Sequence, residues 1–181
     1  MRPLLLLDVD GPLNPHCVQP GFVRHELTEG EKTWVVHLNP RHGAELRALA
    51  ATFDLVWASS WEHGANRLLS PLLGLPQLPT ILWPDRMPVA HGSWKTPYVA
   101  EWVGDRPFVW VDDGVGEADV ACFPAADQVV LPVDGRTGLT AADFAAIRKS
   151  FADKANRAHS WGEENTSRGS RPDRADGSST Y

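Results

Sequence analysis

The stretch Leu4-Leu5-Leu6-Leu7-Asp8-Val9-Asp10-Gly11-Pro12-Leu13-Asn14 decides the fold. A short, unbroken apolar run that ends at a turn signal is typical of a buried strand in a parallel sheet. Asp8 and Asp10 stand two positions apart, so both side chains are predicted to project from the same side of the strand's carboxyl end. Open α/β sheets bind ligands at this end. Two neighbouring acids repel each other unless a cation lies between them, which favours a functional site over a simple Asp-Gly turn.

Composition is typical of a globular protein. The 181 residues suit one domain, with or without a tail, and 43% hydrophobic and 22% charged residues are ordinary proportions. The net charge of −6 argues against a broad, positively charged surface that binds nucleic acid. The apolar run that follows Arg2 is too short for a signal-peptide core or a membrane span. Cys17 and Cys122 have no partners at metal or redox spacing, so we expect a cytoplasmic protein with reduced thiols and no membrane partner.

A β-hairpin is predicted directly after the first strand. Residues 22–27 and 33–38 are rich in β-forming side chains, and the polar, glycine-containing residues 29–32 separate them. The whole segment 14–38 leaves the carboxyl end of the first strand. We therefore expect the hairpin to cover the site as a small flap.

Strands and helices alternate along the rest of the chain. Further strands are predicted at residues 54–58, 78–82, 107–111 and 127–131, and helices at residues 40–53, 62–73 and 98–103 and from residue 140 onward. This alternation predicts an α/β fold, namely a Rossmann-like parallel sheet with helices on both faces, which spans residues 1–152. Residues 153–181 are dominated by polar and charged residues and are predicted to form a disordered tail.

Two helix starts carry capping signals. Asn39 is predicted to cap the first helix, with Pro40 at its first position. Thr140 is predicted to cap the last helix, with Asp143 completing an acidic variant of the capping box.

Polar residues gather where the predicted strands end. The set comprises Asp8, Asp10, Ser59, Asp112 and Asp113, with Lys95 in the loop before the third helix. In aspartate-based phosphoryl transfer one carboxylate attacks phosphorus, a second moves protons, and a hydroxyl and an ammonium hold the charged oxygens. Carboxylate oxygens also suit Mg²⁺. The set therefore predicts phosphoryl transfer with Mg²⁺, and Gly11 is predicted to let backbone amides approach the phosphate.

The motifs stand in an order that resembles the haloacid dehalogenase (HAD) superfamily of phosphohydrolases. Residues 8–11 look like the first motif, residues 55–59 like the second, Lys95 like the third and residues 110–113 like the fourth. The resemblance implies a HAD-like fold over residues 3–150.

A narrower resemblance is carried by two shorter segments. Residues 57–61 and the start of the last helix at residues 138–140 look like the small HAD domains associated with bacterial RNA-repair proteins. The segments between the motifs are too short for a large cap domain, so only the hairpin is expected to cover the site.

The superfamily resemblance assigns catalytic roles. It makes Asp8 the nucleophile and Asp10 the general acid and base. It implies that Ser59 binds the phosphoryl oxygens, although Ser60 also follows the strand and is an alternative substrate-binding hydroxyl. It further implies that Lys95 neutralises the phosphoryl oxygens.

The same resemblance places a Mg²⁺ ion among the acids. The predicted ligands are Asp8, the backbone carbonyl of Asp10, and Asp112. Asp113 is expected to complete the metal site by orienting metal-bound water or Lys95. Glu117 and Asp119 are alternative acids for the fourth motif.

These assignments predict a magnesium-dependent phosphatase that acts through an aspartyl-phosphate. The predicted substrate is either a phosphorylated small molecule or a nucleic-acid end, and an open site slightly favours the bulkier one. A response-regulator receiver uses similar residues, but its acids come in a different order along the chain. A non-catalytic domain that binds phosphate or metal is the remaining alternative.

Overall fold

The computed structural model describes residues 2–84 and 89–151. The chain divides into two compact units, Met1–Ser150 and Phe151–Tyr181, and all the elements described below belong to the first. The predicted tail at residues 153–181 lies outside the described residues. Its disorder, and the domain boundary at residue 152, stay predictions.

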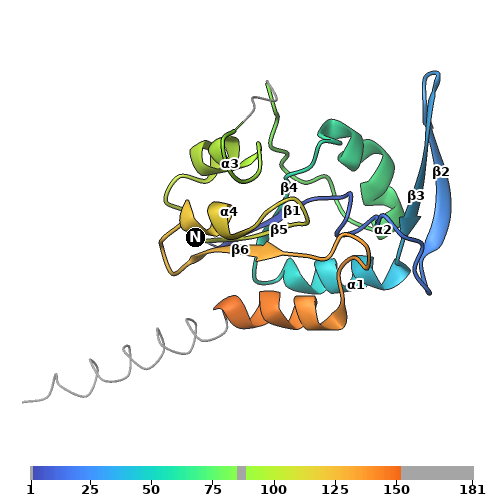
Figure 1. The fold of residues 1–181 in the computed structure, drawn as a ribbon. Helices are drawn as coiled ribbons and strands as arrows, with labels where there is room; N and C mark the ends of the chain where they lie inside the picture. The colour runs from blue at the N-terminus through green and yellow to red at the C-terminus, as the bar shows by residue number, and fades with distance from the viewer. Residues whose placement is uncertain (1, 85–88, 152–181) are drawn as a thin grey trace, which may run out of the picture. The chain divides into compact units, whose positions relative to one another are not determined.

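Four parallel strands form the central sheet in the order β4-β1-β5-β6 (Figure 1). Their bounds are Leu4–Leu7 for β1, Asp54–Trp57 for β4, Phe108–Asp112 for β5 and Gln128–Pro132 for β6. The leucines of β1 are at most 1% exposed, as predicted for a buried strand. Since β1 pairs with β4 on one side and β5 on the other, the carboxyl ends of these three strands lie side by side.

Helices cover both faces of the sheet. Figure 1 shows α3 (Thr96–Val103) and α4 (Glu117–Ala121) on one side, and α1 (Pro40–Leu49) and the helical residues 141–150 on the other. The predicted α/β architecture is therefore confirmed. No helix in the described part of the chain is long and apolar enough to cross a membrane.

Both predicted helix caps are confirmed. The Asn39 side chain accepts a hydrogen bond from the Arg41 N–H at 3.0 Å. The Asp143 carboxylate accepts from the Thr140 N–H at 2.7 Å, while the Thr140 hydroxyl accepts from the Asp143 N–H at 3.3 Å. Each cap satisfies backbone donors that a helix start would otherwise leave unpaired.

The predicted hairpin forms a separate two-stranded antiparallel sheet of β2 (Val23–Glu29) and β3 (Lys32–Leu38). Two polar contacts between described residues join it to the domain. The Asn14 side chain accepts a hydrogen bond from the His37 N–H at 2.8 Å, and Arg67 pairs with Glu29. Among the described residues between β1 and α1, this hairpin is the only regular structure, as expected for a domain without a large cap.

The helix predicted at residues 62–73 is irregular. It consists of a π-helical turn, η1 (Ala65–Leu69), followed by the short α2 (Ser70–Leu73). Pro71 has no N–H to donate, which disfavours the α-helical hydrogen-bond pattern at this point. The predicted stop is confirmed, because Gly74 ends α2 in the left-handed conformation with φ +62°.

The prediction of a strand at residues 78–82 is wrong. Only a single bridge forms there, between Thr80 and Trp57 of β4. Pro79 cannot donate a hydrogen bond, and the Leu78 N–H donates to the Asn66 side chain instead of to a neighbouring strand. Helix α4, which precedes β6, was not predicted.

Candidate active site

A buried cluster of three charged side chains lies at the carboxyl ends of the central strands. Lys95 Nζ donates to Asp8 Oδ2 at 2.5 Å and to Asp112 Oδ2 at 2.7 Å. Asp8 follows β1 and Asp112 ends β5, so the pairing of these strands brings the two carboxylates together. The three residues are only 6%, 6% and 1% exposed, in the order Asp8, Lys95, Asp112. The predicted motifs one, three and four therefore meet in the structure.

Burial and neighbouring charge shift the pKa values in this cluster. The pKa of Asp8 is raised to about 7, mainly because the carboxyl is buried and secondly because Asp112 lies close, while Lys95 and Ser59 oppose the shift. Burial acts to lower the pKa of Lys95, but the two carboxylates outweigh it, so this pKa lies above its ordinary value. Lys95 is therefore charged at neutral pH and is held against both acids.

The loop that carries Lys95 is held by Asp119. The Asp119 side chain accepts hydrogen bonds from the Ser93 N–H at 2.7 Å and from the Thr96 hydroxyl, which lie on either side of Lys95. Its second oxygen accepts from the Gly116 N–H at 2.8 Å. Asp119 is 1% exposed, so its carboxylate is engaged with the loop. Sequence reasoning considered Asp119 for the fourth motif and missed this positioning role.

Three carboxylates converge in a way that fits a divalent cation. Asp8, Asp112 and Asp113 each offer an oxygen, and these oxygens all lie within 4.8 Å of one another. When all three are ionised, the single positive charge of Lys95 leaves the cluster with surplus negative charge. Hard oxygen ligands in such a cluster suit Mg²⁺. The Asp10 side chain is not part of the cluster, and its backbone carbonyl stays a predicted ligand.

The half-buried Asp113 is packed between two glycines. A Cβ atom at Gly11 would lie 2.2 Å from Asp113 Cγ, and one at Gly135 would lie 2.2 Å from Asp113 Oδ2. Gly11 also has a φ of +87°, and its N–H donates to the Asn14 carbonyl at 2.9 Å. The structure thus gives Gly11 a steric role beside Asp113. Its predicted approach to phosphate stays a prediction.

His16 is a neighbour of the site that sequence reasoning missed. Its Nε2 lies 2.8 Å from Asp113 Oδ2. No spacing pattern marked it, because the two residues are 97 positions apart in the chain.

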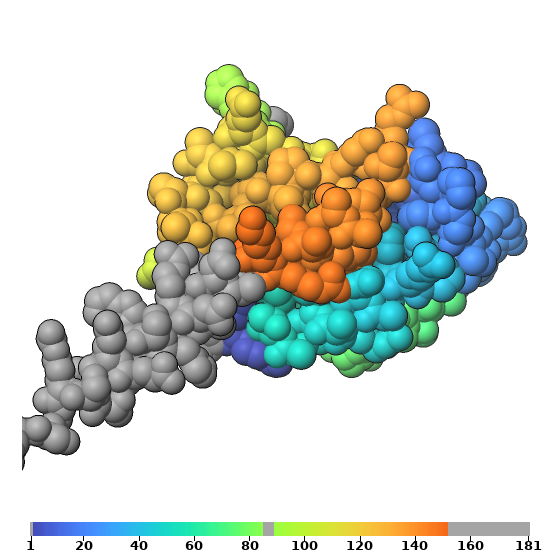
Figure 2. Space-filling model, turned by 90° about the horizontal axis from the view of Figure 1, so that it is seen from below, coloured from blue at the N-terminus to red at the C-terminus, as the bar shows by residue number. Residues whose placement is uncertain are grey.

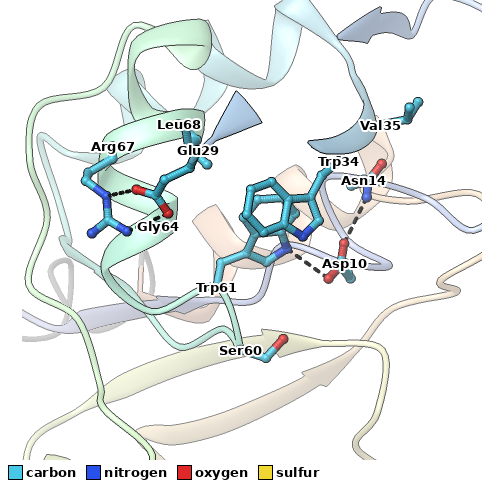
Figure 3. Close-up of a pocket in the computed structure, with 10 residues that line it drawn as sticks. All are labelled: Asp10, Asn14, Glu29, Trp34, Val35, Ser60, Trp61, Gly64, Arg67 and Leu68. Carbon is cyan, nitrogen blue, oxygen red and sulfur yellow. Dashed lines mark hydrogen bonds and ion pairs between the residues drawn. The ribbon is translucent and has the colours of Figure 1, made fainter. Parts of the chain in front are cut away.

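Asp10 is oriented by two donors that the sequence did not reveal. Trp61 Nε1 donates to Asp10 Oδ2 at 2.9 Å, and Asn14 Nδ2 donates to Asp10 Oδ1 at 2.8 Å (Figure 3). Asn14 also accepts from the His37 N–H, so it links Asp10 to the hairpin. A carboxylate has about four acceptor positions in all, so both oxygens of Asp10 retain room for a proton.

The two serines after β4 occupy different places. Ser59 is 0% exposed and forms a hydrogen bond with Asp8 that acts to lower the pKa of that carboxyl. Ser60 is exposed and lines the space above the site. Of the two candidate phosphate-binding hydroxyls, that of Ser59 is therefore buried and that of Ser60 is accessible from the pocket.

Two adjoining pockets open at this edge of the sheet. One, of about 340 Å³, is lined by residues that include Asp8, Lys95, Asp112 and Asp113. The other, of about 370 Å³, lies between the hairpin and η1 and is lined by Asp10, Trp34 and Trp61 among others (Figure 3). Ser60 lines both pockets. The two acids of the first motif therefore face neighbouring compartments.

Comparison with protein families identifies a match over most of the chain. A family model described as "HAD domain in Swiss Army Knife RNA repair proteins" matches residues 4–144. This range contains every residue of the site described above. No curated protein matches the chain.

Proposed function

Because the chain belongs to the family of HAD domains in Swiss Army Knife RNA repair proteins, we propose that it is a magnesium-dependent phosphohydrolase. Membership supports phosphohydrolase chemistry in general, and the proposal adds a covalent aspartyl-phosphate on Asp8. The covalent intermediate is supported by the buried Lys95, which bridges Asp8 and Asp112, with Asp113 beside them. This cluster brings a nucleophile, a cation and acceptor oxygens together at the carboxyl ends of the strands.

In the first step, a carboxylate oxygen of Asp8 attacks the substrate phosphorus. The bond between phosphorus and the leaving oxygen breaks, and Asp10 in its protonated form gives its proton to that oxygen. The hydrogen bonds from Trp61 and Asn14 fix the direction in which Asp10 points. The step leaves an acyl phosphate on Asp8 and a free hydroxyl on the leaving group.

In the second step, the Asp10 carboxylate takes a proton from a water molecule as the water attacks phosphorus. The bond between phosphorus and Asp8 breaks, inorganic phosphate departs, and Asp10 is protonated again. The same carboxyl therefore acts as acid and then as base.

Charge on the transferred group is stabilised by fixed partners. Lys95 holds the equatorial oxygens, where the charge of a loose transition state is spread, and the accessible Ser60 hydroxyl donates to one of them. Ser59 lies below the surface and supports Asp8. Asp8, Asp112 and Asp113 would hold Mg²⁺. When bound there, the ion offsets the repulsion between these carboxylates and the phosphate.

The experiment that tests this proposal uses the purified full chain and an aryl phosphate. We expect hydrolysis that requires Mg²⁺, is lost with EDTA and is abolished in Asp8→Asn. The matched control is Asp105→Asn, which makes the same change at an exposed position before β5 and should keep full activity. Activity that survives Asp8→Asn would refute the assignment of the nucleophile.

A second candidate narrows the substrate to the terminal phosphate of RNA. The match to a family of HAD domains in RNA repair proteins favours it. A 3′-phosphorylated oligonucleotide should then be turned over in preference to free nucleotides. Equal turnover of the two would count against a role in end processing.

A further inference from the structure

The steps above use only Asp10, Asn14, Ser60 and Trp61 from the lining of the pocket between the hairpin and η1, and the rest of that pocket has no role in them. We propose that it binds the nucleoside part of the leaving group, with Trp34 as the surface on which the base stacks. This rests on the proposed function in one respect, since it takes Asp10 as the group that protonates the leaving oxygen.

The position of the pocket relative to the two acids is the first argument. Asp8 lines one compartment, Asp10 lines the other, and Ser60 lines both. A phosphoryl group held at Asp8 must present its leaving oxygen to Asp10, so the atoms beyond that oxygen continue into the second compartment. Its volume of about 370 Å³ falls in the ordinary range for small-ligand pockets.

The aromatic walls of the pocket are the second argument. Trp34 comes from β3 and Trp61 from the loop after β4, and Figure 3 shows both rings beside Asp10. Their centroids lie 5.7 Å apart with 49° between the ring planes, so the rings are tilted and do not cover each other face to face. Trp61 is fixed through its bond to Asp10. Trp34 lines the pocket and is only partly buried, so part of its ring is accessible there, and tryptophan faces stack on any nucleobase.

The charge of the pocket is the third argument. Among the ten residues drawn in Figure 3, Arg67 is the only lysine or arginine. It already makes two bonds to the Glu29 carboxylate, at 2.5 and 3.0 Å. The Asp10 carboxylate adds negative charge. A second phosphate would find no spare cation here, so the pocket suits an uncharged base and sugar.

The walls are held in place without a ligand. The pair between Arg67 and Glu29 ties the end of the hairpin to η1, and Asn14 ties β3 to the loop after β1. A pocket whose walls are already positioned loses less entropy when it binds a flat ligand.

The test compares two phosphate esters by kcat/KM, adenosine 3′-monophosphate and glycerol 2-phosphate. We expect Trp34→Leu to lower the ratio of the first to the second about tenfold, the size of one lost stacking contact. Trp102→Leu makes the same change at a tryptophan that is 38% exposed on α3, and should leave the ratio unaltered.

A second variant covers the case in which Trp34→Leu does not fold. Gly64 lines the pocket with helical φ and ψ of −61° and −34°, and a Cβ there would meet Trp61 only at an ordinary 3.8 Å. Gly64→Leu should therefore fill the pocket from the opposite wall and lower the same ratio.

Binding of adenosine, measured by calorimetry, needs no turnover and separates the two proposals. Adenosine binding that weakens in Trp34→Leu or Gly64→Leu, in a protein that hydrolyses neither ester, would refute the phosphohydrolase and support the pocket. Hydrolysis with an unaltered ratio in both variants, or adenosine binding that neither variant weakens, would overturn the pocket proposal and show that Trp34 only packs against Trp61.

Discussion

The substitution Lys95→Met tests whether the Lys95 charge compensates the two buried carboxylates of Asp8 and Asp112. Methionine keeps much of the apolar stem of lysine and removes the ammonium group that bonds Asp8 and Asp112. Two carboxylates would then lie close together with side chains that are 8% and 2% exposed. We expect a large loss of stability in the absence of divalent cations.

The magnitude follows from the geometry. At an effective dielectric constant of about 20, unit charges at the 2.7 Å Lys95–Asp112 distance attract with about 6 kcal/mol before the cost of burial. Removing one partner of a buried charge pair costs about 3–5 kcal/mol once burial is included. The loss should grow as pH rises above about 7. Asp8, whose pKa is raised from 3.8 to about 7, ionises there in the wild type, and in the variant it has no lysine to offset its burial.

The assay is urea unfolding of the wild type and the variant with EDTA, repeated with MgCl₂. Mg²⁺ should restore part of the loss, because it also neutralises the acids. Arg67→Met removes a cation from an ion pair whose side chains are 54% and 43% exposed, and should have far less effect. A loss in Lys95→Met no larger than in Arg67→Met would refute the balancing role.

Two further predictions concern residues outside the reaction centre. Asp119→Asn should destabilise the protein by about 1–3 kcal/mol in urea unfolding, because asparagine leaves a buried N–H or hydroxyl donor unpaired; unchanged stability would contradict its hold on the Lys95 loop. Burial lowers the pKa of His42 from 6.5, so the unfolded chain binds the proton more readily, and stability should fall as pH drops below about 6.5. His42→Gln should flatten this slope, and a slope of equal steepness in the variant would rule out His42 as its source.

Much of the architecture could be predicted because local patterns carry it. The short leucine run of β1 predicts a strand that is covered on both faces. Asn39 and Thr140 mark helix starts because their side chains accept hydrogen bonds from the first backbone N–H groups. The predicted motifs met at one sheet edge because parallel strands leave little freedom there. The resemblance to small HAD domains is confirmed by the family match.

What could not be predicted depends on contacts between distant parts of the chain. Asp10 meets Trp61 across 51 positions, and His16 meets Asp113 across 97. No local pattern encodes such pairs, so neither contact was predicted. The strand predicted at residues 78–82 failed because Pro79 cannot donate and Asn66 captures a backbone donor.

The central claim is that Asp8 becomes phosphorylated during turnover. It is tested most directly by acid-quenching the working enzyme and reducing it with borohydride, which converts an aspartyl-phosphate into homoserine. Mass spectrometry of the digested chain should find homoserine at position 8 in the wild type and at no position in enzyme incubated without substrate. Homoserine at position 10 or 112, or none at all while phosphate is being released, would contradict the account.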